Sequence, residues 1–291
     1  MDDGVTWLAA SAGWTPESSN PFSAAGSFGP TWSCFHLCAA EDEMVRNGRS
    51  RSGLYTASFG RRTPHLLQRL GDFLRYEAAQ GRSVIVACPE GVSAEALVEE
   101  ALEPEFSPTA VRPTDPRWLV HSTTREAWSQ IQACGELRSA ALLGGVDCSP
   151  IGELLVGDPP DYAQHVALGT MDAPGPEFVV ACRQAGRMLP SPDIEYRPGV
   201  RLYFDAHLIL RAGLGVRDGL HTLKVRDRLP LEPYLVAKVS VDDLPSLAAG
   251  ERWTTGLFLQ RANAAFADLD HGRSQSEVSA DGQPTFIARE H

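Results

Sequence analysis

The spacing of apolar residues in positions 1–112 predicts an α/β domain. Thr63-Pro64 is typical of a helix start, and five apolar residues between 66 and 74 fall on one face of the helix that follows. The apolar run within 83–88 predicts a buried strand, and Ser93 is positioned to cap a second helix after it. This order of helix, strand and helix favours an α/β unit.

Residues 113–250 predict a second domain, of the α+β class, beyond a proline-containing boundary at 103–116. A strand at 118–121 is followed by a helix from Arg125 that should end at Gly135. Thr123 is expected to cap this helix, because Glu126 follows it at capping-box spacing. The other expected elements are a helix at 158–169 begun by Asp158, strands at 178–182, 200–204 and 234–241, and a hairpin joining 214–217 to 220–225 through the turn Asp218-Gly219.

The end of the chain predicts an amphipathic helix over 251–269 and a polar, disordered tail over 270–291. No apolar run approaches the roughly 18 residues that span a membrane, and Met1-Asp2-Asp3-Gly4 lacks the pattern of a secretory signal. We therefore expect a cytoplasmic protein with no membrane partner. The six cysteines show no spacing of a disulfide framework, so free thiols are expected.

One basic block interrupts an otherwise acidic chain. The net charge of -11 argues against a protein that coats nucleic acid over a wide surface, since such binding depends on neutralising phosphates. Between Arg46 and Arg82, eight arginines stand against two acidic residues. This block is either a solvated arginine-rich surface or a surface for RNA or nucleotide phosphate, with Arg61 and Arg62 as candidate substrate contacts.

A family resemblance begins at His121-Ser122-Thr123-Thr124-Arg125-Glu126-Ala127-Trp128. This segment is similar to the opening of the catalytic lobe of the RNA 2'-phosphotransferases, where a strand ends in His-Gly-Thr-Ser before an Arg-Glu-Ala helix. Asp205-Ala206, Val216-Arg217-Asp218-Gly219 and Leu229-Pro230-Leu231-Glu232-Pro233-Tyr234-Leu235 resemble the closing run of the family in the same order. The likeness covers about 118–243.

The resemblance implies an ADP-ribosyltransferase fold, in which two small antiparallel sheets hold NAD in a cleft between them. Such enzymes cleave the bond between nicotinamide and ribose, and this family delivers ADP-ribose to an RNA 2'-phosphate. By position, His121 would bind the NAD ribose and take part in catalysis, with Ser122, Thr123 and Arg125 as further cofactor contacts. The implied function is an NAD-dependent transferase acting on a phosphate-bearing nucleic acid or nucleotide.

Arginines would supply positive charge to such a reaction, because an oxocarbenium-like ribose must be held beside an anionic acceptor. Arg201 is the candidate catalytic arginine, and Arg183, Arg187 and Arg217 are candidate acceptor contacts. Surface solvation is the alternative role for each of them.

Two departures from the family pattern favour a different function. The glycine after the family's histidine is Ser122, and the family's His-x-His strand corresponds to Gly-Glu-Leu-Leu at 152–155. The alternative is therefore a non-catalytic nucleotide- or RNA-binding module that keeps the fold without the chemistry.

Cys88 raises a weaker alternative, a phosphatase-like hydrolase. Strand, cysteine, glycine-containing loop and capped helix over 83–102 have the order found in cysteine-dependent phosphatases. Those enzymes need an arginine six residues after the cysteine to clamp phosphate and lower the thiol pKa, and this chain has Ala94 there. A plain strand cysteine is the competing interpretation.

Cys34, His36 and Cys38 alternate, so on a strand they would face one side together. Three such ligands form a partial zinc site, but a structural site needs a fourth ligand, and no second Cys or His pair lies nearby in the sequence. Buried thiols that bind no metal are the competing interpretation.

Overall fold

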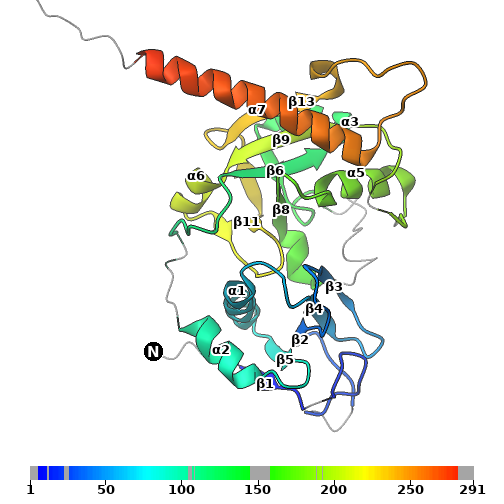
Figure 1. Ribbon diagram of the computed structural model, residues 1–291, viewed down its shortest axis with the longest axis vertical. Helices are drawn as coiled ribbons and strands as arrows, with labels where there is room; N and C mark the ends of the chain where they lie inside the picture. Colours follow the sequence, from blue (N-terminus) through cyan, green and yellow to red (C-terminus); the bar gives the residue numbers. More distant parts are fainter. Residues whose placement is uncertain are drawn as a thin grey trace, which may run out of the picture.

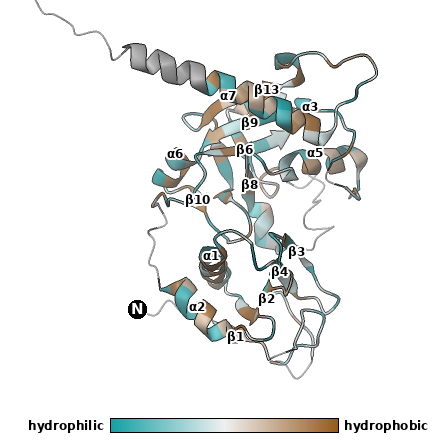
Figure 2. Ribbon diagram, viewed as in Figure 1, coloured by the Kyte–Doolittle hydropathy of each residue, from teal (hydrophilic) through white to brown (hydrophobic). Residues whose placement is uncertain are grey.

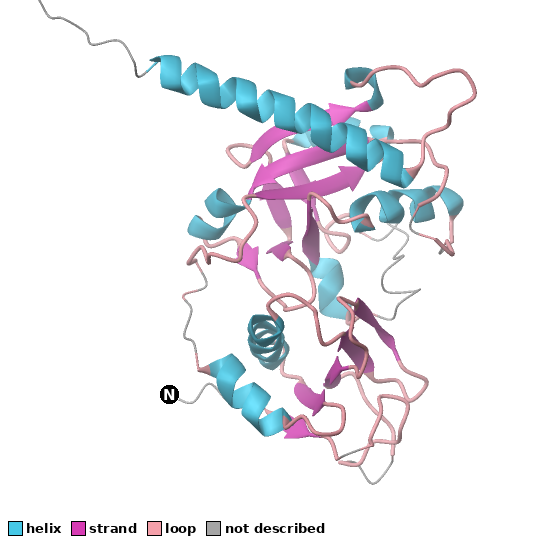
Figure 3. Cartoon of the chain, in the orientation of Figure 1, coloured by secondary structure: helices cyan, strands magenta, loops and turns pink. Residues whose placement is uncertain are grey.

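The computed structural model describes residues 6–280 of the 291-residue chain, apart from 12, 23–25, 104–106, 108, 145–157, 188 and 192. The strands form two groups, and helix α1 (Leu66–Ala79) lies between them (Figure 3). We call residues 6–102 the N-terminal half and the described residues from 107 to 280 the C-terminal half. The chain is a mixed α+β protein with several sheets. Among the described helices, none combines the length and the apolar content needed to cross a bilayer.

The N-terminal half is built on a five-stranded sheet with the order β1-β5-β2-β4-β3. The first four strands in this order run parallel, and β3 is antiparallel to β4. The strand bounds are Trp7–Ala9 for β1, Trp32–Leu37 for β2, Val45–Arg49 for β3, Tyr55–Phe59 for β4 and Ser83–Ala87 for β5. The strand predicted at 83–88 is thus confirmed.

Helices α1 and α2 (Ala94–Leu102) share one face of this sheet, where Phe35, Phe59 and Phe73 pack in a common core. Ser93 caps α2 as predicted, because its Oγ accepts the N–H of Ala96 at 3.1 Å. The predicted start of α1 at Thr63-Pro64 is wrong by two residues. Thr63 Oγ1 donates to the carbonyl of Met44 at 3.0 Å, so it ties the chain to the residue before β3 instead of capping the helix.

The C-terminal half contains a six-stranded sheet with the order β10-β11-β8-β6-β9-β13, and each pairing in it is antiparallel. Strands β7 and β12 form a separate two-stranded ladder. The strand bounds are Trp118–Thr123 for β6, Glu136–Arg138 for β7, His165–Thr170 for β8, Val200–Asp205 for β9, Gly215–Val216 for β10, Leu223–Arg226 for β11, Arg228–Pro230 for β12 and Leu235–Ser240 for β13.

Helices flank this sheet, and α7 crosses it and extends past its edge (Figure 1). Phe258, Ala262 and Phe266 of α7 pack against Val120 and Tyr203 of the sheet. The described part of α7 mixes apolar and polar residues, as expected for a helix with one buried face (Figure 2). The helix bounds are Arg125–Cys134 for α3, Gly175–Ala185 for α5, Ala206–Arg211 for α6 and Thr255–Ala280 for α7, with 3₁₀ turns η1 at Pro160–Gln164 and η2 at Val241–Asp243.

Several local predictions for this half are confirmed. Strand β6, helix α3 and strands β9 and β13 lie where the pattern placed them. Gly135 ends α3 in a left-handed conformation with φ of 73°. The residue that caps α3 is Thr124 and not Thr123, because Thr124 Oγ1 accepts the N–H of Ala127 at 3.2 Å while Thr123 is the last residue of β6.

Two segments have the opposite secondary structure to the one predicted: one predicted helix is a strand, and one predicted strand is a helix. The expected helix at 158–169 is the short turn η1 followed by strand β8, since 165–168 pair with β11 and 169–170 with β6. The expected strand at 178–182 lies inside helix α5, which Gly186 ends with φ of 63°. A short apolar run fits both conformations, and here the tertiary contacts of each segment decide.

Two further boundaries differ. Asp218-Gly219 is not a two-residue turn, because Gly215 pairs with Val225 and Val216 with Lys224, which leaves 217–222 as a six-residue loop. The C-terminal helix runs to Ala280, so 270–280 are helical and not a disordered tail. Positions 281–291 lie outside the described residues.

Candidate functional site

The resemblance pointed to His121, and the structure places it where two strands separate. Within the described chain, β8 pairs with β6 through Leu119–Thr170 and Val120–Gly169, and His121 is the next residue of β6. The half-buried His121 ring reaches across the gap, with Nδ1 3.2 Å from the carbonyl oxygen of Ala167 in β8. Because a carbonyl oxygen can only accept, Nδ1 carries the proton, and Nε2 of a neutral ring is left as an acceptor.

Burial lowers the pKa of His121 to about 4, and the positive charge of Arg183 adds to this effect against the opposing hydrogen bond to Ala167. The ring is therefore neutral at pH 7. A neutral imidazole can exchange hydrogen bonds with ribose hydroxyls, but it has no proton to give as a general acid at that pH.

A pH dependence of stability follows from this depressed pKa. Since the unfolded value is 6.5 and the folded value about 4, the unfolded state binds more protons between these limits. We expect the free energy of unfolding to rise with pH from about 4 to 6.5 more steeply in the wild type than in His121→Gln. Urea unfolding at several pH values measures the difference, and identical slopes would contradict the assignment.

The other predicted cofactor contacts do not converge on His121. Ser122 is buried on the opposite face of β6, and its Oγ donates to Glu177 Oε1 at 2.6 Å. Thr123 is also buried, and Arg125 forms an exposed ion pair with Asp242 at 2.9 Å. The structure thus corrects the grouping of these residues around one ligand.

Arg201, the candidate catalytic arginine, is completely buried. Its Nη1 pairs with Glu177 Oε1, its Nη2 donates to the carbonyl of Met171, and its Nε donates to Asn263 Oδ1 at 3.3 Å. These contacts join β9 to α5 and α7. The guanidinium therefore holds the fold together and is not presented to a ligand, which corrects the predicted role.

The predicted acceptor arginines lie in different environments. Arg183 and Arg187 are exposed at and after the end of α5, and Arg183 is close enough to His121 to influence its pKa. Arg217 is instead held by Asp115 at 2.7 Å and by the carbonyl of Ala110. Among the predicted arginines, Arg183 is the one whose charge acts on the pKa of His121.

Several arginines of the Arg46 to Arg82 block are held by other groups of the chain. Arg61 and Arg62 share Glu41 at 3.3 and 3.8 Å. Arg69 donates to the carbonyl of Gly219 in the C-terminal half at 3.1 Å. Arg82 is buried and pairs with Glu77 and Asp161. Arg69 and Arg82 therefore stabilise the fold and the contact between the halves, and a phosphate-binding role for the rest of the block stays a prediction.

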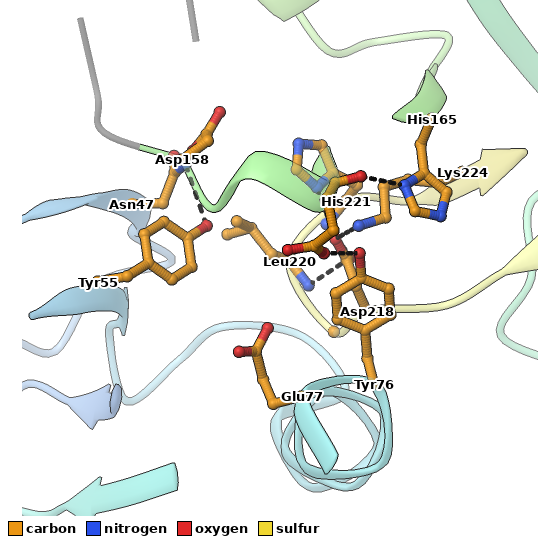
Figure 4. Close-up of polar contacts among 12 residues, drawn as sticks. Asn47, Tyr55, Tyr76, Glu77, Asp158, His165, Asp218, Leu220, His221 and Lys224 are labelled. Atoms are coloured by element: carbon orange, nitrogen blue, oxygen red, sulfur yellow. Dashed lines mark hydrogen bonds and ion pairs between the residues drawn. The ribbon is translucent and has the colours of Figure 1, made fainter. Parts of the chain in front are cut away.

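A second polar centre, which the sequence analysis did not predict, lies between the two halves (Figure 4). We call Tyr76, Tyr162, Asp218, His221 and Lys224 the interface cluster. Asp218 is fully buried, and its Oδ2 lies 2.8 Å from both Lys224 Nζ and His221 Nδ1. Lys224 Nζ also sits 3.8 Å from the ring centroid of Tyr76 and 3.7 Å from that of Tyr162. A buried ammonium is thus balanced by one carboxylate and two aromatic faces.

Backbone groups of the 217–222 loop hold the Asp218 side chain in place. Asp218 Oδ1 accepts the backbone N–H groups of Leu220 at 3.1 Å and His221 at 2.8 Å. Burial opposes ionisation, yet the charges and hydrogen bonds of His221 and Lys224 hold the pKa of Asp218 well below its usual range. Asp218, His221 and Lys224 recur at intervals of three in the sequence, which is a signal too weak to identify the cluster without Tyr76 and Tyr162.

The structure gives little support to a phosphatase-like role for Cys88 or to a metal site at Cys34, His36 and Cys38. Burial, with Glu95 nearby, raises the pKa of Cys88 to about 11, so the thiol is protonated at pH 7. Cys38 Sγ lies 3.6 Å from His36 Nδ1, but no group of three metal-ligating side chains suited to an ion exists in the described part of the chain. The cysteines described are all free thiols, as expected: Cys34, Cys38, Cys88, Cys134 and Cys182.

Fold and sites together define a mixed α+β protein with two polar centres, one at a strand divergence and one between its halves. Comparison with protein-family models, with curated proteins and with solved structures gave no match. The segment at 152–155, which corresponds to the His-x-His strand of the RNA 2'-phosphotransferases, lies outside the described residues.

Proposed function

We propose that the C-terminal half is an NAD-dependent transferase that binds NAD beside His121 and delivers ADP-ribose to a phosphate-bearing nucleic acid or nucleotide. The observation that carries the proposal is the position of His121 at the point where β8 leaves β6. There His121 is the first residue of β6 past the last pairing with β8 in the described chain, and its half-buried ring spans the gap between the two strands.

The charges next to His121 suit the chemistry. Neutral His121 can bind ribose hydroxyls without adding repulsion to an oxocarbenium-like transition state. Arg183, exposed on α5, supplies the positive charge that an anionic acceptor requires. The proposed roles are therefore ribose binding for His121 and acceptor binding for Arg183, with Arg187 following it in the sequence.

A non-catalytic nucleotide-binding module is the second candidate. The observation that favours it is the burial of Arg201 in its pair with Glu177, because this removes the predicted catalytic cation from the site. The fold and His121 would then bind a nucleotide without turning it over.

Nicotinamide release from NAD by the full chain, with and without 2'-phosphorylated RNA, distinguishes the two candidates. We expect release to fall by at least about a hundredfold in His121→Ala, as when a single transition-state contact is removed from an active site. His207→Ala is the matched control, since His207 is also half-buried in this half but lies on α6.

Calorimetric titration with NAD completes the experiment. Binding without nicotinamide release would favour the module over the enzyme. The absence of both binding and release, with the wild-type protein folded, would overturn both candidates.

A further inference from the structure

The interface cluster contains a histidine arranged as a base. His221 Nδ1 lies 2.8 Å from the fully buried carboxylate of Asp218. An ionised carboxylate can only accept, so Nδ1 carries a proton, and Nε2 is the ring nitrogen left to exchange a proton with a bound molecule. A buried aspartate that orients a histidine in this way is the arrangement by which hydrolases prepare an imidazole to take a proton from a nucleophile.

The His221 ring is held in place by Asp218 but is still accessible to solvent. Asp218 has no exposed side-chain surface, whereas 31% of the His221 side chain is exposed. The Tyr162 ring meets His221 edge-on, with the centroids 5.7 Å apart at 71°. Because Nδ1 faces the buried carboxylate, the solvent-accessible part of the imidazole is free to meet a small molecule.

A second titratable group lies near His221 but in a different environment. Burial raises the pKa of the half-buried Asp158, although the charge of His221 opposes this shift. Asn47 Nδ2, from strand β3, donates to Asp158 Oδ1 at 2.7 Å, and Asp158 has no ion-pair partner among the described residues. Two carboxyl groups with opposite pKa shifts near one imidazole are typical of an acid–base site.

The charges around the site indicate what it would bind. Four carboxyl groups, those of Asp158, Asp218, Glu77 and Asp161, lie near three cations, Lys224, Arg82 and Arg69. The charges nearly balance, so they favour neither an anion nor a cation. The amide of Asn47 and the carboxyl of Asp158 therefore suit a neutral, hydroxyl-bearing molecule.

We propose that His221, oriented by Asp218, is the general base of a reactive site between the two halves, and that it activates the hydroxyl group of a neutral small molecule or of water. In the simplest reaction, Nε2 accepts a proton from water while the water oxygen bonds to the carbonyl carbon of an ester. The ester C–O bond then breaks, the alkoxide or phenolate leaves with the electron pair, and Nε2 releases its proton to solvent.

Hydrolysis of 4-nitrophenyl acetate by the full chain tests this proposal without NAD. General-base catalysis contributes about 10²–10⁴-fold on a fitted substrate, so we expect the wild type to exceed His221→Gln by at least about tenfold on this generic ester. His207→Gln should keep the wild-type rate. Equal rates for the wild type and His221→Gln, with both proteins folded, would overturn the proposal.

Acylation by diethyl pyrocarbonate, followed residue by residue with mass spectrometry, gives a second measurement on the wild type itself. We expect His221 to react faster than the similarly half-buried His207. Asp218→Asn should lower the ratio of the two rates within one molecule, a change that a merely structural role for Asp218 would not produce. A His221 rate at or below that of His207 in the wild type contradicts the inference.

Discussion

Replacing Glu177 with alanine is expected to lower the free energy of unfolding by about 3–5 kcal/mol, the cost of breaking a buried ion pair from one side. Glu177 and Arg201 are both buried, and Ser122 donates to the same carboxylate. Without Glu177, the Arg201 guanidinium stays in the interior without its counter-charge. Urea unfolding of the full chain measures the loss.

Two comparisons make this result specific. Glu195→Ala removes an exposed ion pair with Arg252 and should cost less than about 1 kcal/mol. The double variant Glu177→Leu, Arg201→Met should recover much of the stability, because it removes both charges together. If Glu177→Ala were no more destabilising than Glu195→Ala, Arg201 could not have the structural role assigned to it, and its catalytic candidacy would return.

Replacing Gly219 with alanine is expected to weaken the contact between the two halves and to cost about 2–4 kcal/mol of stability. Gly219 has φ of +72°, and a Cβ there would lie 2.1 Å from the carbonyl oxygen of Arg69 in α1. The 217–222 loop would have to move away, and the hydrogen bond from Arg69 Nη1 to the Gly219 carbonyl would be lost. Hydrogen exchange along α1 reports the change together with urea unfolding.

Gly135→Ala is the matched control for the clash between a Cβ at position 219 and the carbonyl oxygen of Arg69. Gly135 has φ of +73°, but nothing lies within 4 Å of its would-be Cβ, so this variant carries the backbone cost without the clash. We expect it to lose about 1 kcal/mol and to leave exchange along α1 unchanged. Equal losses in the two variants would mean that the loop does not dock tightly on α1.

The predictions that succeeded rest on signals confined to a few neighbouring residues. Ser93 and Gly135 mark helix ends because one side chain or one positive φ meets the backbone within a single turn. Strands β5, β9 and β13 follow from short apolar or alternating runs. Such features survive in almost any tertiary context.

The failures lie where local signals were compatible with two structures. The run from Phe178 to Cys182 suits a strand by composition, yet it lies within α5, where Val180, Ala181 and Cys182 are buried and Val179 is exposed. Position 169 suits a helix end by composition, yet Gly169 pairs with Val120 in the sheet. Sequence spacing cannot choose between these outcomes, because the deciding partners lie in other elements.

The candidate sites also combine features that the sequence predicted with features that only the tertiary structure decided. The sequence by itself determined that His121 lies on a strand, that free cysteines are present and that α and β elements are mixed. Only the tertiary structure decided that Arg201 is a buried ion-pair partner and that Tyr76 encloses Lys224 beside Asp218. The physical reason is that burial and charge pairing depend on residues far apart in the chain, whereas caps and periodicity are complete within one element.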